Sequence, residues 1–384
     1  MPTPPPLSHM PFKLQNDADN IIINNSDLYI SPRAWKEINA SYTKEEIKEA
    51  ISNGIDEYQI PVPKDIITLE EAKQDFQKLK ELDVTKLFKS GKTFTRYEYQ
   101  HMLSDLYIDS CNIGNKSSNY FHQDSRYLCD SINSPSPHRS WYIKKFRYTL
   151  LNCLWTLKFE HVDLKILRTA LHLRKYVASQ FRPSAAKAVY QNKNSKTVLD
   201  FSMGWGDRLN GFLSCEETAI YFGIDPNRSL YEGYGKQIDT FNTGKKVIIY
   251  DQPAEEVDIP KDTFDTVFTS PPYFNIERYT QEDNQSWKRY KKLDDWLRGF
   301  LFPVLEKSWH GLKSGGSMVI NISDVYSNHT INKICDPMNE FISKLPNAHY
   351  MGTIGLRMAK RPNSRAVGQD GIFTEPMWSW RKNR

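Results

Sequence analysis

A serine, two prolines and two aromatic residues stand together where a short apolar run ends. Thr266 to Phe268 predicts a buried strand, and Ser270-Pro271-Pro272-Tyr273-Phe274 follows it. A double proline cannot continue the hydrogen-bond ladder of a sheet, so the strand must end there. The Ser270 hydroxyl and the Pro271 carbonyl can accept hydrogen bonds, and nearby aromatic faces can stack on a flat ring. This corner suits a planar group that carries an NH2; the alternative is a structural turn with both rings packed beneath it.

A second candidate site is a glycine-containing turn that follows the predicted strand 197–201. The turn and the residue before it supply Asp200, Ser202, Gly204 and Gly206. Glycines let the backbone approach a ligand closely where a helix begins. Asp225 lies 25 residues after Asp200, at the end of the next predicted strand, where an acidic residue commonly binds ribose hydroxyls. Two glycines alone are a weak signal, because they are also typical of an ordinary turn.

The residues around this turn distinguish between two classes of cofactor. A dinucleotide-binding turn would carry a third glycine where this chain has Leu209. The Asp200 carboxylate would also repel a pyrophosphate, whereas it would attract the sulfonium and ammonium groups of S-adenosylmethionine. The sequence therefore predicts S-adenosylmethionine rather than NAD.

Alternating strands and helices after Lys196 predict an α/β fold with a doubly wound, mainly parallel sheet. The predicted strands cover 197–201, 219–223, 246–250, 266–268, 317–322, 349–358 and 376–381. The predicted helices cover 207–213, 230–241 and 293–310, the last of them ended by 312–316. In such sheets ligands bind at the carboxyl ends of the strands, so both candidate sites are expected at one edge. The domain is predicted to span 161–384.

The first 160 residues carry no recognisable chemistry. Residues 1–25 are proline-rich and then polar and predict a poorly ordered tail, whereas 26–160 are predicted to be mostly α-helical. Three capping boxes predict helix starts, namely Thr43 with Glu46, Thr68 with Glu71 and Thr95 with Glu98. Residues 112–137 are rich in Ser, Asn and Pro and predict a long loop. DNA contact, substrate choice and scaffolding remain open as functions of this region.

The overall composition is that of an ordinary globular protein. The chain has 384 residues, of which 39% are hydrophobic and 25% charged, with a net charge of +5. This charge is compatible with a nucleic-acid partner without requiring one. Five scattered cysteines without a Cys-x-x-Cys pair predict a reducing compartment and no metal site. No stretch has the form of a membrane span or a signal peptide, which predicts a cytoplasmic protein without a membrane partner.

Several short motifs, in this order and spacing, make residues from about 175 to 382 resemble an S-adenosylmethionine-dependent amino-methyltransferase of DNA, of the phage and bacterial kind. The matching segments resemble the part that closes over the methionine end of the cofactor (181–184), the first cofactor motif (200–206), the ribose motif (221–227), the catalytic (D/N/S)PPY motif (270–273) and the last strand (375–378). One departure is Trp205, which stands where a small residue is common.

The resemblance implies a class I methyltransferase-like fold, S-adenosylmethionine as cofactor, DNA as partner, a connection to restriction and modification, and roles for particular residues. The implied catalytic residues are Ser270, Pro271, Pro272 and Tyr273. The implied cofactor-binding residues are Phe181, Arg182, Pro183, Ser184, Asp200, Ser202, Gly204, Gly206, Asp225, Pro226, Asp251 and Ser270. The residues expected to contact nucleic acid are Phe274, Lys288, Arg289, Lys291, Lys292, Lys360 and Arg361, although each lysine or arginine alone is also typical of a solvated surface.

The implied reaction is methyl transfer to an exocyclic amino group. The lone pair of such an amine is delocalised into the ring, and two acceptors on its N–H groups would help to expose it. A base in a duplex must first be flipped out, at a cost of about a few kcal/mol. Serine at the first motif position is more typical of enzymes that methylate cytosine N4, so that base is favoured over adenine N6. The alternatives from other classes are an RNA amino-group methyltransferase, a protein amide methyltransferase and a catalytically inactive nucleic-acid-binding subunit.

Overall fold

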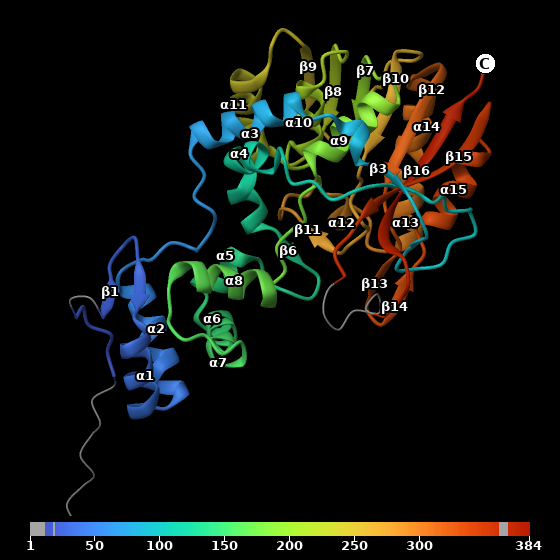
Figure 1. The fold of residues 1–384 in the computed structure, drawn as a ribbon. Helices are drawn as coiled ribbons and strands as arrows, with labels where there is room; N and C mark the ends of the chain where they lie inside the picture. The colour runs from blue at the N-terminus through green and yellow to red at the C-terminus, as the bar shows by residue number, and fades with distance from the viewer. Residues whose placement is uncertain (1–11, 18–19, 361–367) are drawn as a thin grey trace, which may run out of the picture. The chain divides into compact units, whose positions relative to one another are not determined.

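The computed structural model describes residues 12–17, 20–360 and 368–384 and divides into two compact units (Figure 1). The first unit is formed by the chain up to Ile66 together with Tyr127–Ala178, and the second by Ile67–Arg126 together with Ser179–Arg384. The predicted boundary at residue 160 therefore needs correction. Residues 67–126 pack with the sheet, whereas residues 161–178 pack with the helices of the first unit.

The first unit is mostly helical, as predicted for this part of the chain. Its elements are β1 (Ile21–Ile23), β2 (Leu28–Ile30), α1 (Pro32–Ser41), α2 (Lys44–Glu57), β6 (Asp130–Ser131), α5 (Pro137–Tyr142), α6 (Lys144–Leu151), α7 (Cys153–Thr156) and α8 (Leu164–Arg174). The capping box of Thr43 with Glu46 begins α2. Buried aliphatic and aromatic residues form one core, in which the Trp141 indole donates to the Ile60 carbonyl at 2.7 Å. Because β1 pairs with β2, residues 21–23 do not belong to the predicted poorly ordered tail.

The second unit contains a sheet of ten strands. These are β3 (Phe88–Ser90), β4 (Thr93–Phe94), β5 (Leu106–Ile108), β7 (Thr197–Asp200), β8 (Ile220–Ile224), β9 (Lys246–Tyr250), β10 (Phe264–Thr269), β12 (Leu312–Asn321), β15 (Ala348–Arg357) and β16 (Ile372–Lys382). Their order is β3-β5-β15-β16-β12-β10-β7-β8-β9, with β4 beside β16. From β9 to β15 every strand is parallel except β16, which is antiparallel to both neighbours. This is the predicted α/β fold, a doubly wound and mainly parallel sheet of the class I methyltransferase type.

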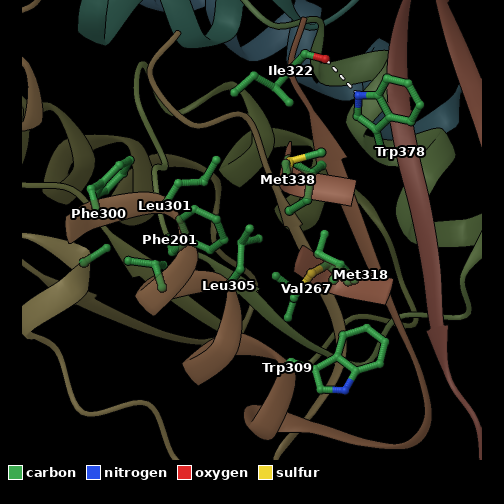
Figure 2. Packing of buried hydrophobic residues seen from close by; sticks show 14 of the residues in the cluster. Phe201, Val267, Phe300, Leu301, Leu305, Trp309, Met318, Ile322, Met338 and Trp378 are labelled. Carbon is green, nitrogen blue, oxygen red and sulfur yellow. Dashed lines mark hydrogen bonds between the residues drawn. The ribbon is translucent and has the colours of Figure 1, made fainter. Parts of the chain in front are cut away.

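Helices cover both faces of this sheet. They are α3 (Leu69–Glu81), α4 (Asn115–Leu128), α9 (Pro183–Asn192), α10 (Asp207–Ser214), α11 (Tyr231–Phe241), α12 (Ser286–Arg289), α13 (Leu293–Trp296), α14 (Phe302–Gly311) and α15 (Cys335–Ser343). Successive side chains of a strand point to opposite faces. On β10, Phe268 accordingly packs edge-on against Tyr190 of α9, whereas Val267 lies in the core with Trp309 of α14 (Figure 2).

The shorter elements of the second unit connect these strands and helices. They are the 3-10 turns η1 (Val84–Leu87), η2 (Arg228–Leu230) and η3 (Ala254–Glu256), the strands β11 (Glu277–Arg278), β13 (Val325–Ser327) and β14 (Thr330–Asn332), and the π-helical turn η4 (Leu297–Leu301). The single helix predicted over 293–310 is therefore α13, η4 and α14 in succession. Residues 312–316, predicted to end that helix, instead lie in β12, because Leu312 already pairs with Phe264 of β10.

Residues 67–126 belong to the second unit because α3 and α4 pack on its helices. Phe76 of α3 stacks on Phe241 of α11 with 4.2 Å between ring centroids. The buried Lys187 ammonium of α9 donates at 2.7–3.0 Å to the carbonyls at the end of α3, those of Leu79, Lys80 and Leu82. The capping box of Thr68 with Glu71 begins α3 as predicted. No helix begins at Thr95 in the described chain, because the chain there leaves β4, which pairs with β16.

Helix α4 replaces most of the loop predicted over 112–137. Its buried face is polar, since Ser118 donates to Asp207, Ser117 accepts from Asn210 at 3.0 Å, and the His122 ring bonds to Gln237 at 2.8 Å. A helix that buries hydrogen-bonding side chains leaves no periodic pattern of apolar residues. The prediction of a loop was therefore wrong because the helix buries polar rather than apolar side chains.

Candidate active site

The predicted cofactor-binding turn begins at Asp200, the last residue of β7, whose side chain is fully buried. Its carboxylate accepts from the Arg208 guanidinium at 2.8 and 3.2 Å and from the Tyr221 hydroxyl at 2.7 Å. Arg208 is buried as well and also donates to the Ser202 carbonyl, which fixes the turn. Asp200 thus has its counter-ion inside the protein. The attraction of a cationic cofactor cannot rest on the charge of Asp200, as the sequence argument assumed.

The two glycines of the turn have different physical roles. Both have positive φ, +57° at Gly204 and +71° at Gly206, a conformation that favours glycine. A Cβ on Gly206 would lie 2.3 Å from the Gln237 side chain, so that glycine is needed for packing under α11. A Cβ on Gly204 would meet only the Ser202 carbonyl, at 3.9 Å. Gly204 therefore leaves an open face on which a ligand can lie close to the backbone.

Asp225 follows β8 and lies across the turn from Gly204. One carboxylate oxygen accepts from the Gly204 backbone N–H at 2.8 Å and the other from the Asn227 N–H at 2.9 Å. Burial raises the pKa of Asp225 to about 6, so the group is still ionised at neutral pH. Each oxygen keeps a lone pair beyond these bonds, which suits the acceptance of ribose hydroxyls. The residues of the turn therefore fit the ribose end of the expected cofactor.

The predicted catalytic corner, Ser270-Pro271-Pro272-Tyr273, lies at the carboxyl end of β10. Ser270 donates to the Asn321 side-chain oxygen at 3.3 Å. The Asn321 amide group in turn donates to Glu375 and to the Pro376 carbonyl, both at 3.3 Å. Asn321 ends β12 and Glu375 lies on β16, so three neighbouring strands supply this chain of hydrogen bonds. Neither residue was predicted to belong to the site. The available signal was a polar residue after the apolar run 318–320.

Tyr273 belongs to the same group of side chains. Burial raises the pKa of the Tyr273 hydroxyl well above its usual range, and the Glu375 carboxylate raises it further. Burial likewise raises the pKa of Glu375, against the opposing effect of its hydrogen bonds with Asn321 and Tyr273. The Tyr273 ring is partly buried and packs against the sheet core. The hydroxyl is therefore held near Glu375, and the residue as a whole is partly exposed.

The aromatic residues beside the corner are less accessible than predicted. Phe274 has a φ of +56° and is 4% exposed, and its ring packs edge-on against Trp296 in the core. The predicted contact of Phe274 with nucleic acid is therefore wrong. Trp205 is buried too, donates to the Ser179 carbonyl at 3.2 Å and packs edge-on against Tyr279.

The predicted closing segment, residues 181–184, lies between the cofactor turn and the sheet. Phe181 packs edge-on against Phe268, and the Arg208 guanidinium lies over its ring at 5.5 Å. Arg182 donates to the Arg357 carbonyl. Pro183 is the first residue of α9 and is buried, and the buried Ser184 donates to the Cys111 carbonyl at 2.7 Å. Pro183 and Ser184 thus make their contacts within the protein.

Two further residues predicted to bind cofactor lie at the ends of neighbouring strands. The Pro226 carbonyl accepts from Asn284 at 2.8 Å, which ties the segment after the catalytic corner to the end of β8. Asp251 follows β9, is half exposed and forms a 3.7 Å ion pair with Arg228. The sheet order therefore brings Asp200, Asp225, Asp251 and Ser270 to one edge.

A family model adds a decisive observation to this geometry. Residues 264–365 match the model of N6/N4 methyltransferases, described as DNA methylase. The match begins at β10 and contains both Ser270 and Asn321. This match supports an S-adenosylmethionine-dependent DNA methyltransferase. Among curated proteins, none matches the chain.

Solved structures of methyltransferases are similar to about half of this chain. A SAM-dependent O-methyltransferase from Thermotoga maritima is 13% identical, with 56% of this chain and 71% of that chain covered and a TM-score of 0.35. A tRNA (m1A58) methyltransferase from Aquifex aeolicus is 18% identical, with 54% and 71% covered and a TM-score of 0.33. A Burkholderia thailandensis N1-methyltransferase with bound S-adenosylhomocysteine is 15% identical, with 53% and 78% covered and a TM-score of 0.35. At these values the likeness carries no argument, and the fold assignment depends on the strand order.

The basic residues from 288 to 292 that were predicted to contact DNA fall into two groups in the structure. Lys288 forms an ion pair with Asp283 at 3.0 Å, and Arg289 pairs with Glu255 at 2.8 Å and with Glu256. Their charges are thus largely neutralised within the protein. Lys291 and Lys292 are exposed, and Lys291 lies 5.1 Å from the Trp287 ring.

The second predicted basic stretch is only partly described. The Lys360 ammonium donates to the Gln369 carbonyl at 2.7 Å and lies over the Phe94 ring at 5.1 Å. Arg361 lies outside the described residues. In the part of the chain that the structure describes, no helix has both the length and the apolar character of a membrane span. Residues 12–17, 20–360 and 368–384 also hold no cluster of three His, Cys, Asp or Glu side chains that could bind a metal ion.

Proposed function

We propose that the protein methylates the exocyclic amino group of a base flipped out of DNA, with cytosine N4 as the favoured target and adenine N6 as the alternative. One observation carries the proposal: the Ser270-Pro271-Pro272-Tyr273 corner and the open glycine turn lie at the same edge of the sheet. The two hydrogen-bond acceptors for an amine therefore lie at the same edge as the turn that would bind the cofactor. Transfer of a methyl group between two bound molecules requires such proximity.

The cofactor half of the site would hold S-adenosylmethionine by its ribose. The ionised Asp225 accepts from the hydroxyls, and the open face of Gly204 lets the ligand lie against the backbone. Asp251, half exposed at the end of β9, is suited to the amine of the adenine ring. When bound, the cofactor supplies a methyl group on a positively charged sulfur.

The base half would hold the target amine and its ring. The Ser270 hydroxyl and the Pro271 carbonyl each accept one N–H of the amine, which draws its lone pair out of conjugation. The Tyr273 ring stacks on the base, a contact worth about 1–3 kcal/mol. This gain offsets part of the cost of flipping the base, which is about a few kcal/mol.

The choice of cytosine N4 rests on serine at the first position of the catalytic motif. The test is to methylate DNA with labelled S-adenosylmethionine, digest it to nucleosides and identify the labelled nucleoside by mass spectrometry. N4-methylcytosine is expected. N6-methyladenine as the only labelled product would overturn the base assignment and leave the enzyme class intact, whereas label in RNA or protein but not in DNA would overturn the proposed substrate.

A further inference from the structure

We infer that Asn321 takes up the hydroxyl proton of Ser270, so that Ser270 can act toward a bound base only as a hydrogen-bond acceptor. This inference rests on the proposed function, because it concerns the contact between Ser270 and the target amine. Its basis is the chain of hydrogen bonds from Pro376 and Glu375 through Asn321 to Ser270.

The orientation of the Asn321 amide follows from its partners. The atom of this side chain that faces β16 lies 3.3 Å from the Pro376 carbonyl and 3.3 Å from Glu375. A carbonyl oxygen can only accept, so the Asn321 atom facing it must be the nitrogen. This holds whichever protonation state Glu375 has. The Asn321 oxygen must then face Ser270.

The role of the Ser270 hydroxyl follows from that orientation. An amide oxygen cannot donate, so the 3.3 Å contact requires Ser270 to donate its one proton to Asn321. The serine lone pairs remain for the Tyr273 hydroxyl, with which Ser270 also forms a hydrogen bond, and for a ligand. Ser270 is therefore prepared to accept from an exocyclic amine and is unable to donate to a ring nitrogen at the same time.

The position of Asn321 is fixed by the sheet. Asn321 is 2% exposed and pairs with Met377 across the antiparallel β12–β16 ladder. The Trp378 indole donates to the Ile322 carbonyl at 3.0 Å, which ties β16 to the residue after Asn321 (Figure 2). Glu375 and Asn321 are thus positioning residues, which act on the reaction through Ser270.

The consequence concerns the choice of base. Cytosine has a ring acceptor, N3, beside its N4 amine, and adenine has N1 beside its N6 amine. A serine that could donate would be able to recognise these ring nitrogens, but an obligate acceptor recognises only the amine. The Ser270 contact itself is then the same for cytosine and adenine, so the preference for cytosine N4 that serine indicates in the resembling family must be realised through other contacts.

A double-mutant cycle tests this coupling. Ser270→Ala is expected to lower kcat about tenfold, the effect of one hydrogen bond made in the transition state. Asn321→Leu is expected to lower kcat about five- to tenfold, with the KM for S-adenosylmethionine unchanged within about twofold. The double variant is expected to be no slower than Ser270→Ala.

Thr269→Val is the matched control, because the buried Thr269 hydroxyl has no hydrogen-bond partner among the described residues. The kcat of this variant is expected to stay normal.

The outcomes distinguish the proposed role of Ser270 from the inferred role of Asn321. Normal turnover by Ser270→Ala would remove the proposed role of Ser270 itself. A slow Ser270→Ala combined with a normal Asn321→Leu, or with losses that multiply in the double variant, would overturn only the inference.

A second measurement does not depend on the folding of Asn321→Leu. The wild-type enzyme and Ser270→Ala are compared on duplex DNA in which the target base is replaced by its deaza analogue, 3-deazacytosine or 1-deazaadenine, which lacks the ring acceptor. An obligate acceptor predicts the same loss from Ser270→Ala on both substrates, within about twofold. If the loss disappears on the analogue, Ser270 donates to the ring nitrogen and the inference is wrong.

Discussion

The two halves of the active-site edge are assembled in different ways. In the cofactor half, the turn around Gly204 is held by Asp225, and these two residues are 21 apart in the sequence. In the base half, Ser270 and Asn321 are 51 residues apart, and Asn321 and Glu375 another 54. The segment from β7 to β8 therefore forms the contact between Gly204 and Asp225 by itself, whereas the hydrogen-bonded part of the base half exists only when β10, β12 and β16 lie side by side.

The halves also differ in how buried carboxylates are stabilised. Asp200 is compensated by the charge of Arg208, and Asp225 by two backbone N–H groups. Glu375 instead receives a hydrogen bond from the neutral Asn321, and burial raises its pKa. If the two halves also function separately, a substitution in the base half should leave the affinity for S-adenosylmethionine unchanged. A substitution in the cofactor half should leave the contacts to the base unchanged.

Tyr273→Ala should impair the base half alone and have the largest effect. Removal of a stacking interaction worth about 1–3 kcal/mol predicts a fall in kcat/KM for DNA of about 5- to 150-fold. The Kd for S-adenosylmethionine, measured by calorimetric titration, should stay within about twofold. Tyr273→Phe keeps the ring and removes only the hydroxyl near Glu375, so its effect should be smaller. Near-normal turnover by Tyr273→Ala would show that the ring is only core packing.

Asp225→Ala should impair the cofactor half alone. Removing a charged acceptor of hydrogen bonds predicts a Kd for S-adenosylmethionine that is weaker by about 10- to 100-fold. Asp251→Ala is the comparison, because Asp251 is half exposed and water can replace its contacts; its effect should be smaller. Unchanged affinity in Asp225→Ala would exclude Asp225 from the ribose site.

Asp207→Asn should reveal that the Asp207 carboxylate, beside the cofactor turn, lowers the free energy of unfolding in a pH-dependent way. Burial raises the pKa of Asp207, the first residue of α10, from 3.8 to about 6. Between these values the native state binds more protons than the unfolded state, so the free energy of unfolding falls as pH rises from about 4 to 6. The substitution removes this loss, on the order of 2–3 kcal/mol. Denaturation curves should show the variant to be more stable than the wild type at pH 7 and not at pH 4; equal behaviour at both values would contradict the shift.

The smallest effect should distinguish two pairs of basic residues in the segment that follows the Ser270-Pro271-Pro272-Tyr273 corner. Joint neutralisation of Lys291 and Lys292, which are exposed, should reduce the slope of log affinity against log salt by up to about 0.9 for each phosphate that these lysines neutralise. Joint neutralisation of Lys288 and Arg289 should change the slope little, because Asp283, Glu255 and Glu256 already balance their charge. Equal changes in the two pairs would show that those ion pairs open when DNA binds.

The sequence alone determined the features that depend on neighbouring residues. The capping boxes at Thr43 and Thr68, the strands that end at Asp200 and Tyr250 and the double-proline corner all follow from local sterics and short-range hydrogen bonds. The order of the strands and helices predicted the α/β sheet, whereas the cofactor was predicted from the residues of the glycine turn and the class of enzyme from the resemblance to a known family. The roles of Ser270 and Asp225 stay predictions until they are tested.

Only the tertiary structure decided which polar groups meet. Helix α4 was missed because its buried face bonds to Asp207, Asn210 and Gln237 rather than to apolar residues. Lys288 looks like a free cation in the sequence and has a carboxylate partner in the fold. Asn321 and Glu375 belong to the site because β12 and β16 lie beside β10. A hydrogen bond depends on two groups meeting at about 3 Å, and for residues far apart in the chain that meeting is set by strand order and register, which no short motif records.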